Sequence, residues 1–563
     1  MERNGRSRVP HDIGSYPFDL IVVGAGINGA GIARDAAMRG LKVLLVDKGD
    51  VASGTTSWST RLIHGGLRYL EYYELYLVHE SLSEREKLLN IAPHLVRPLP
   101  FIIPIYEYSK RGTMLVRLGM VAYDFLSWSK SLDRHKMLTR EEVLDRVPGL
   151  DPEGLLGAAM YYDGQVEYAE RLAVENAVSA QENGAIILTY AEVERLVVED
   201  GNVVGVEFKD LLEGGRHEVR APVTVNVAGP WVDEVLRQMD YAEERMIGGT
   251  KGSHLVVDPF PGAPASEALY AEAREDGRPY FIVPWNGRYL IGTTDIRYEG
   301  DLDLVVADEE EIDYLINETN TVIPSANLTR DKVLFTYSGV RPLPYQPEGA
   351  EGSVTRGHLI YDHAEHDPKI GGLISIVGGK LTTYRNLARE TVEAVYQKLG
   401  RKAPRCRTDE VPLPGGALGR AADFEEFVAD FKLTSGLAEE LATRLLKLYG
   451  ARAPEVLEMA GDDHSLRVPL SATAAVETGI IGAEVLYAFR RELAEKLGDV
   501  LLRRSMVGMG PRVALDVDEA AARIAVQHLG WSRERAEHEV GEFREYVRRY
   551  KPKALSETEP LKA

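Results

Sequence analysis

The sequence predicts an α/β fold followed by a helical C-terminal region, and three stretches lead to that prediction. Residues 18–47 read as a short buried strand, a glycine-rich turn, a helix and a second strand. Residues 279–295 contain the strand-like runs PYFIVPW and RYLIGTTD. From about residue 423 the apolar residues recur with the period of a helix, as in LAEELATRLLKLYG and AFRRELAEKLGDVLLRR.

Length and composition limit the class of protein. With 563 residues the chain exceeds a single core, so we expect about three or four domains or sub-domains. A formal charge of −21 argues against binding of nucleic acid. Cys406 is the single cysteine, which excludes an internal disulfide and is typical of the reducing cytoplasm. We find neither an apolar secretory signal at the start of the sequence nor a run of about 18 apolar residues.

A glycine fingerprint lies in the setting that dinucleotide binding requires. The apolar run FDLIVVG leads into Gly24, Gly26 and Gly29, and a helix-forming stretch and a second strand follow, ending at Asp47. Glycines permit a tight turn and close approach of the backbone to a pyrophosphate, which the helix N-terminus attracts. An acidic residue about 20 residues further on can accept hydrogen bonds from the adenosine ribose. The spacing therefore predicts a Rossmann-type domain, and Asp47 argues against a 2′-phosphate and so against NADP.

The residues after Asp47 favour FAD over NAD. The stretch KGDVASGTTSWSTRLIHGGLRYL is rich in Ser and Thr hydroxyls, whereas an NAD-binding domain normally continues with a regular βα unit. Residues 223–235 and 371–388 each read as a strand that ends in glycine and enters a helix. Non-covalent FAD is therefore the expected cofactor. Its predicted binding residues in these segments are Thr55, Thr56, Ser57, Ser59, Leu62, His64, Gly65, Gly66, Ala228, Gly229, Gly378, Gly379, Leu381 and Thr382.

Several longer motifs resemble those of one flavoprotein family. They are GAGINGAGIARDAAMRG, STRLIHGGLRYLEYYE, NVAGPWVD, KGSHLVV, IGTTD, SGVRPL and GGKLTTYR. In these motifs the chain resembles the FAD-dependent glycerol-3-phosphate dehydrogenases of the aerobic, quinone-linked type. The resemblance implies a Rossmann-type FAD-binding domain interleaved with a β-sheet substrate domain, as in glutathione-reductase-like and glycine-oxidase-like folds, and a C-terminal all-α cap. The implied ranges are 18–90, 155–245 and 351–400 for the FAD-binding domain, 91–154 and 246–350 for the substrate-binding and membrane-facing domain, and 401–563 for the cap.

The resemblance also implies an activity: oxidation of sn-glycerol 3-phosphate to dihydroxyacetone phosphate by hydride transfer to FAD, with electrons passed to a membrane quinone. Oxidation of an alcohol requires a base or a cationic partner for the hydroxyl, and a phosphorylated substrate calls for arginines. The motifs assign His254 as the base or hydroxyl partner and Arg341 to the same oxygen or to the phosphate. They assign Arg68 and Arg356 to the phosphate, Tyr69 to the substrate pocket, and Lys380 to the flavin and substrate side.

Alternatives stay open at this point. We expect His64 to pack around the flavin and Asp295 to organise hydrogen bonds of its loop. Neither HExxH nor CxxC occurs, nor a carboxylate cluster with ligand spacing, so no metal is expected. The rival functions are a glycerol-3-phosphate oxidase that uses O2, a flavin amine oxidase of the glycine or sarcosine type, and a flavin-binding protein without catalysis.

Residues 108–136 are a candidate contact with the inner face of the cell membrane. A basic and apolar strip in an acidic protein suits peripheral attachment, although an ordinary core helix with a solvated basic edge has the same pattern. We therefore expect a cytoplasmic, peripherally attached protein, with a homodimer as a further expectation. The basic members are Lys110, Arg111, Arg117, Lys130, Arg134 and Lys136, and the apolar members are Met114, Leu115, Leu118, Val121, Phe125 and Trp128.

Overall fold

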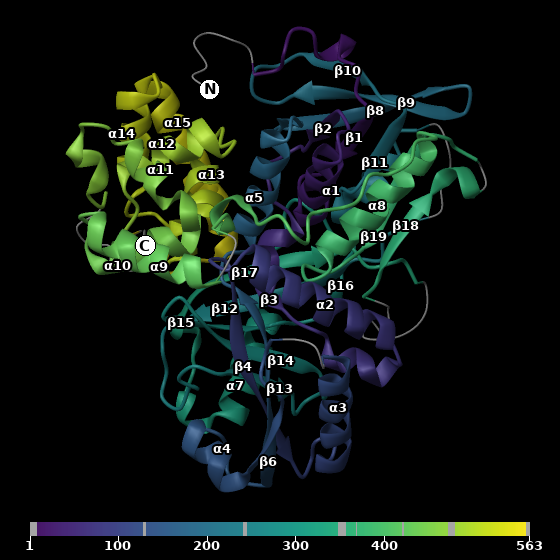
Figure 1. Cartoon of the computed structure of the whole chain (residues 1–563). Coiled ribbons are helices and arrows are strands. Elements are labelled where there is room, and N and C mark those ends of the chain that lie inside the picture. The colour runs from purple at the N-terminus through teal and green to yellow at the C-terminus, as the bar shows by residue number, and fades with distance from the viewer. Residues whose placement is uncertain are drawn as a thin grey trace.

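The computed structural model describes residues 8–127, 131–239, 245–346, 356–366, 369–418, 421–470 and 479–558. Figure 1 shows a first sheet with its helices in the upper part of the view, a second sheet below it, and the C-terminal helices at the upper left. The predicted fold class, α/β sheets followed by a helical region, is confirmed.

The first sheet contains the predicted dinucleotide-binding unit. Its strand order is β18 (His358–Asp362), β19 (Leu373–Gly378), β11 (Val223–Asn226), β1 (Leu20–Val23), β2 (Val43–Val46) and β7 (Ile186–Leu188). All neighbours are parallel except β18 and β19, and every residue of β1, β2 and β11 is buried, as expected for a parallel sheet. The predicted strand–turn–helix–strand unit is therefore confirmed as β1, α1 (Ile27–Met38) and β2.

Helices cover the first sheet and a small ribbon extends from it. Helix α1 packs against α5 (Ala169–Glu182) and α8 (Tyr384–Lys398), and their apolar residues join those of the sheet in one core. The ribbon is antiparallel and lies beside the first sheet in Figure 1. It consists of β8 (Ala191–Glu199), β9 (Asn202–Asp210) and β10 (Arg216–Arg220).

The second sheet has the order β16-β12-β15-β14-β13-β4-β6-β3, with β17 also paired to β12 and β5 to β6. Strands β14 and β15 correspond to the two runs predicted near residues 279–295, so that prediction is confirmed. The strands are β3 (Leu62–Ile63), β4 (Val96–Tyr106), β5 (Lys136–Thr139), β6 (Leu155–Val166), β12 (Thr250–Val257), β13 (Ala268–Glu272), β14 (Pro279–Trp285), β15 (Arg288–Gly292), β16 (Ile296–Arg297) and β17 (Val333–Arg341).

The chain passes between the two sheets several times. Strand β6 pairs with β4 along its length in the second sheet, and the next helix, α5, packs on the first. Four helices contact strands of the second sheet: α2 (Leu75–Ile91), α3 (Thr113–Leu126), α4 (Arg140–Arg146) and α7 (Glu309–Val322). A capping box between Asp308 and Glu311 fixes the start of α7. The division into domains at the residue numbers given above stays a prediction.

The C-terminal region is helical, as predicted. Helix α10 shows why, because Leu441, Leu445 and Leu448 recur on one face and are buried. The elements are α9 (Ala421–Thr434), α10 (Glu439–Tyr449), α11 (Ala453–Glu458), α12 (Gly482–Arg491), α13 (Leu497–Asp499), the π-helix η13 (Val500–Arg504), α14 (Asp518–His528), α15 (Arg533–Val547) and α16 (Lys553–Thr558).

Candidate active site

A first cavity, of about 700 Å³, opens at the carboxyl ends of β1, β2, β11 and β19. This edge of a parallel sheet is where dinucleotides bind in Rossmann-type folds. Most of the predicted cofactor residues line it: Gly24, Gly26, Asp47, Thr55, Thr56, Ser59, Ala228, Gly229, Gly378, Gly379 and Leu381.

The glycines of the fingerprint make the turn possible. Gly24 has a φ of +111°, and a Cβ there would lie 2.7 Å from the carbonyl oxygen of Val227. Gly29 does not line the cavity. A Cβ at Gly29 would lie 1.8 Å from the carbonyl oxygen of Gly24, so this glycine lets α1 begin directly against the turn.

Asp47 lies at the end of β2, as the fingerprint requires. Its carboxylate accepts hydrogen bonds from the backbone N–H groups of Ala25 at 2.5 Å and Gly49 at 2.7 Å. Burial raises the pKa of Asp47, and these two bonds oppose that effect. Asp47 therefore ties the glycine turn to the loop after β2, and its contact with a ribose stays a prediction.

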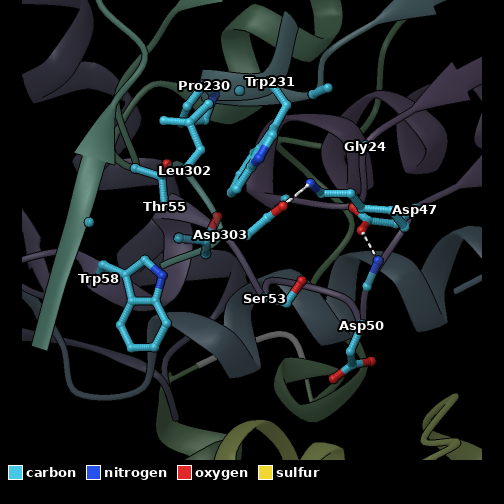
Figure 2. A pocket seen from close by; sticks show the side chains of 18 of the residues that line it. Gly24, Asp47, Asp50, Ser53, Thr55, Trp58, Pro230, Trp231, Leu302 and Asp303 are labelled. Carbon is cyan, nitrogen blue, oxygen red and sulfur yellow. Dashed lines mark hydrogen bonds and ion pairs between the residues drawn. The ribbon is translucent and has the colours of Figure 1, made fainter. Parts of the chain in front are cut away.

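Polar groups of the residues that line the first cavity fit FAD. Asn28 Oδ1, Trp231 Nε1 and Gln238 Oε1 belong to lining residues, are buried, and have no hydrogen-bond partner among the described residues. Figure 2 shows Trp231, Leu302 and Asp303 close together at one side of the cavity. Lys48 reaches Asp303 at 2.9 Å and lies 4.6 Å from the centre of the Trp231 ring. Buried polar atoms without protein partners call for a polar ligand.

A second cavity, of about 320 Å³, adjoins the first. The two share the lining residues Thr55, Trp58, Ser59, Gly339, Pro342, Gly379, Lys380 and Leu381. All six residues predicted for catalysis and substrate binding line the second cavity, namely Arg68, Tyr69, His254, Arg341, Arg356 and Lys380. Leu62, His64, Gly66 and Thr382 from the predicted cofactor set line it too.

Two predicted cofactor residues besides Gly29 line neither cavity. The Ser57 hydroxyl donates to the Ala52 carbonyl at 2.7 Å and thus stabilises the loop after β2. The Gly65 N–H donates to the Tyr123 phenol oxygen and to Asp163, each at 3.1 Å. Both residues therefore stabilise segments whose neighbouring residues line the cavities.

His254 lies on β12 and is 1% exposed. Its Nε2 is 2.9 Å from the Thr60 hydroxyl, its ring stacks on Tyr337 at 4.7 Å, and its Nδ1 has no hydrogen-bond partner among the described residues. Burial lowers the pKa of His254 well below its usual value, and the positive charges of Arg341 and Arg61 lower it further. The imidazole is therefore neutral near pH 7.

Asp295 holds two of the predicted arginines together. Its Oδ1 is 3.0 Å from Arg341 Nη1, and its Oδ2 is 3.2 Å from Arg356 Nη2. Burial alone would raise the pKa of Asp295, but the two guanidinium groups outweigh it and lower the pKa. Arg356 Nη1 is buried and has no hydrogen-bond partner among the described residues. Asp295 was expected to organise hydrogen bonds of its loop, and in the structure it forms ion pairs with Arg341 and Arg356.

The second cavity is cationic although the whole chain is acidic. Among the described residues that line it, five are arginine or lysine and two are carboxylates: Arg68, Arg278, Arg341, Arg356 and Lys380 against Glu74 and Asp295. An anionic ligand would satisfy this imbalance, and arginine forks match a phosphate group in particular.

Lys380 stands where the two cavities meet. Its Nζ donates to the Ser81 hydroxyl at 2.8 Å and lies 4.6 Å from the centre of the Tyr69 ring. Its enclosed position lowers the pKa of Lys380 to about 7, although Asp163, Glu80 and Glu74 act against that shift. Burial and the charge of Lys380 lower the pKa of His64 to about 3, so His64 is uncharged.

A buried ion pair behind His254 was not predicted from the sequence. Arg61 and Glu170 form two hydrogen bonds of 2.7 Å, and both side chains are fully buried. Arg61 lies 5.8 Å from the centre of the Tyr337 ring, on which His254 stacks. Arg61 lies in the motif STRLIHGG, so the sequence could have identified it as a residue of the site. Nothing in the sequence indicates that Glu170 is its partner.

Two family models match the chain. The model described as FAD dependent oxidoreductase covers residues 19–385, and the C-terminal domain of alpha-glycerophosphate oxidase covers residues 406–536. A glycerol-3-phosphate dehydrogenase from Synechocystis is 47% identical over 95% of this chain and 97% of its own. An aerobic glycerol-3-phosphate dehydrogenase from Staphylococcus haemolyticus is 34% identical over 89% of this chain and 88% of its own.

Solved structures agree with these matches. The glycerol-3-phosphate dehydrogenase from Bacillus halodurans, complexed with FAD, is 30% identical, covers 96% of each chain and superposes with a TM-score of 0.77. A glycine oxidase from Bacillus cereus is 20% identical over 70% of this chain and 98% of its own, with a TM-score of 0.50, and shows the shared fold.

Proposed function

The chain belongs to the family of FAD-dependent glycerol-3-phosphate dehydrogenases, and from that premise we propose that it oxidises sn-glycerol 3-phosphate to dihydroxyacetone phosphate. One observation carries the proposal: a neutral buried His254 and several arginines line one cavity, which shares a wall with the cavity that fits FAD.

His254 is the proposed base. A secondary alcohol is a very weak acid, and a positioned base accelerates the loss of its proton by about 10²–10⁴-fold. His254 is neutral and its ring is stacked on Tyr337, and we propose that it takes the hydroxyl proton as the carbon is oxidised. Arg341 can polarise the same oxygen or hold the phosphate. Bound FAD supplies the acceptor for the hydride that leaves the carbon.

Arg68 and Arg356 are the proposed phosphate ligands. The Asp295 carboxylate holds Arg356 through one nitrogen, Nη2, while Nη1 faces no protein partner among the described residues. A guanidinium oriented in this way is ready to bind a phosphate oxygen without reorganisation. Tyr69 lies beside Lys380 in the same cavity, and we assign both to the substrate side of the flavin.

A membrane quinone is the electron acceptor that we propose, and the surface near the second cavity supports it. Helix α3 exposes Met114 at 79%, Leu118 at 59% and Phe125 at 73%, and Tyr73 and Tyr76 are exposed at 87% and 73%. Helix α3 also contacts the 3-10 helix η3 (Leu67–Tyr72), which carries Arg68 and Tyr69. Large apolar side chains exposed together on one helix are typical of a protein or membrane contact.

The basic residues of the strip divide into two groups. Lys110, Arg117, Arg134 and Lys136 are exposed, whereas Arg111 forms ion pairs with Glu71 and Glu272. Trp128 and Lys130 lie outside the described residues. Among the helices of the described residues, none is long and apolar enough to cross a membrane. We propose peripheral attachment at the cytoplasmic face of the cell membrane through the exposed residues of this strip.

An anaerobic titration tests this function. Glycerol 3-phosphate should bleach the flavin absorbance of the holoenzyme, while sarcosine and glycine should leave it unchanged. Adding a quinone in vesicles to one sample and O2 to another then identifies the acceptor. Fast recovery of the absorbance with quinone and slow recovery with O2 supports the dehydrogenase, and the reverse order supports an oxidase. A flavin that glycerol 3-phosphate cannot bleach contradicts the proposal.

A further inference from the structure

The loop after β2 supports the glycine turn of the first cavity. The Ala52 N–H donates to the Ala25 carbonyl at 3.0 Å, and the Thr56 hydroxyl accepts from the Ile27 N–H, in the first turn of α1, at 3.1 Å. Thr55, Thr56 and Ser53 of this loop also line the cavity. The position of this loop therefore determines the shape of the site that fits FAD.

A residue of the same loop is held by the C-terminal helices. Asp50 is 1% exposed, and Figure 2 shows its carboxylate directed away from Asp47 and toward the C-terminal ribbon. Arg503 Nε is 2.5 Å from Asp50 Oδ2, and Arg504 forms hydrogen bonds of 2.8 and 2.7 Å to the two oxygens of Asp50. One carboxylate thus receives two guanidinium groups from consecutive residues.

The two arginines lie at the end of a π-helix. Residues Val500–Arg504 form a π-helix, and the Ser505 N–H returns to the Val500 carbonyl at 2.9 Å. A π turn is wider than an α turn and recurs at functional positions in helices. Asp499 also receives Arg503 Nη2 at 2.8 Å, so Arg503 is held from both ends.

Tyr190 and Arg171 make further contacts between the C-terminal region and the rest of the chain. The Tyr190 hydroxyl donates to Asp499 at 2.6 Å, and the Tyr190 N–H donates to the Gly49 carbonyl at 2.9 Å. Arg171 on α5 binds Glu492 through two hydrogen bonds of 2.7 Å. The lining of the first cavity itself includes Asp499, Leu502, Arg503, Phe543 and Tyr546 from the C-terminal region.

We propose that the C-terminal helical region helps to retain FAD. Arg503 and Arg504 bind Asp50 and thereby hold the loop after β2 in the conformation that binds FAD. This role goes beyond the oxidation of glycerol 3-phosphate, because it concerns how the cofactor is retained. Linkage makes the coupling reciprocal: bound FAD must stabilise the docked C-terminal region by as much as that region stabilises bound FAD.

The first test measures release of FAD from the diluted holoenzyme, followed by the fluorescence of the freed flavin. Asp50→Asn removes the charge between the two arginines, and we expect FAD release to be at least about tenfold faster than in the wild type. The matched control is Glu484→Gln, a buried carboxylate inside the C-terminal region that accepts from Arg444 at 2.7 Å and Tyr449 at 3.1 Å and does not line the cavity. Its FAD release should stay within about twofold of wild type. Equal release rates in Asp50→Asn and the control overturn the proposal.

The second test needs no variant, so it decides the question even where Asp50→Asn does not fold. Amide hydrogen exchange is compared in the full chain with FAD bound and after its removal. We expect faster exchange at Val500–Arg504 without FAD and unchanged exchange in helix α10, at Glu439–Tyr449. Unchanged exchange at both segments contradicts the proposal. Because neither experiment uses glycerol 3-phosphate, a failure here leaves the proposed substrate unaffected.

Discussion

The phenol oxygen of Tyr123 accepts a hydrogen bond from the Gly65 N–H at 3.1 Å. Tyr123 lies on the buried face of α3, whose other face is exposed and apolar, and Gly65 lies in the loop beside the second cavity. The same phenol donates to Asp163 at 2.8 Å, and Arg85 also binds Asp163. The helix proposed to meet the membrane is therefore bonded directly to the loop that leads into η3, the 3-10 helix that carries Arg68 and Tyr69.

Tyr123→Phe should loosen that loop. The variant leaves Asp163 without one donor and Gly65 without one acceptor, so we expect a loss of about 1–2 kcal/mol in the free energy of unfolding. We also expect kcat/KM for glycerol 3-phosphate to fall by about tenfold, because the loop positions substrate residues. Tyr106→Phe is the control, since its buried hydroxyl donates to the Asp151 carbonyl at 3.0 Å and lines neither cavity. Equal kcat/KM in the two variants would show that the bond to Gly65 has no catalytic importance.

Arg341→Ala should cripple turnover while FAD stays bound. Arg341 lines the second cavity and not the first, so the cofactor should not depend on it. Loss of one donor that faces developing charge typically costs about 10²–10³-fold in rate. Steady-state kinetics and the flavin content of the purified variant measure both parts. Arg330→Ala, which removes a partly exposed arginine paired with Glu309 and Asp313, is the control. Near-wild-type kcat/KM in Arg341→Ala would remove it from the active site.

His254→Ala should slow flavin reduction in a single turnover by about 10²–10⁴-fold, more than it weakens binding. If only KM changes, His254 binds substrate and is not the base. The control is His363→Ala, because His363 is buried, contacts the Ser375 hydroxyl at 2.8 Å and lines neither cavity.

The lowered pKa of His254 also predicts how the stability of the protein changes with pH. Since the folded pKa is lowered well below the unfolded value of 6.5, the unfolded chain alone takes up the proton just below pH 6.5. The free energy of unfolding should therefore fall as the pH drops below 6.5, by at most about 1.4 kcal/mol per pH unit from this group. His254→Ala should lose that part of the dependence. An identical pH dependence of stability in wild type and variant would contradict the lowered pKa.

Local patterns in the sequence predicted much of this site, because they report local geometry. The fingerprint from Gly24 to Asp47 placed a strand, a turn and a helix correctly, since these residues are neighbours in the chain. The cationic cavity joins His254 on β12 with Arg341 on β17, and only the family resemblance could bring such distant residues together. The partners Asp50 and Arg504 are further apart still in the sequence, and no local pattern encodes a contact over such a separation.

The double variant Met114→Glu/Phe125→Glu should weaken attachment to membranes. Both side chains are largely exposed on α3, and a carboxylate there opposes burial in a lipid interface and repels anionic lipid. We expect binding to anionic vesicles in a sedimentation assay to fall by at least about tenfold, with unchanged turnover when a soluble dye is the acceptor. Leu304→Glu/Leu433→Glu, at side chains exposed at 65% and 85% elsewhere, is the control. Equal vesicle binding by the two double variants would show that α3 is not the contact.

Lys380 should make the affinity for substrate depend on pH near neutrality. Its folded pKa is about 7, whereas an exposed lysine has a pKa of 10.5, so its positive charge disappears as the pH rises through about 7. An anionic substrate then loses one attractive charge, and KM for glycerol 3-phosphate should rise across pH 6–9. The phosphate of the substrate also titrates near this range, so the decisive comparison is with Lys380→Met, in which the part due to the lysine is absent.

The stability of the protein gives an independent test of the same pKa. Above pH 7 the unfolded chain holds a proton that the folded chain has released. The free energy of unfolding should therefore rise with pH between about 7 and 10 in the wild type and rise less in Lys380→Met. Parallel profiles of both KM and stability in the two proteins would show that Lys380 keeps an ordinary pKa.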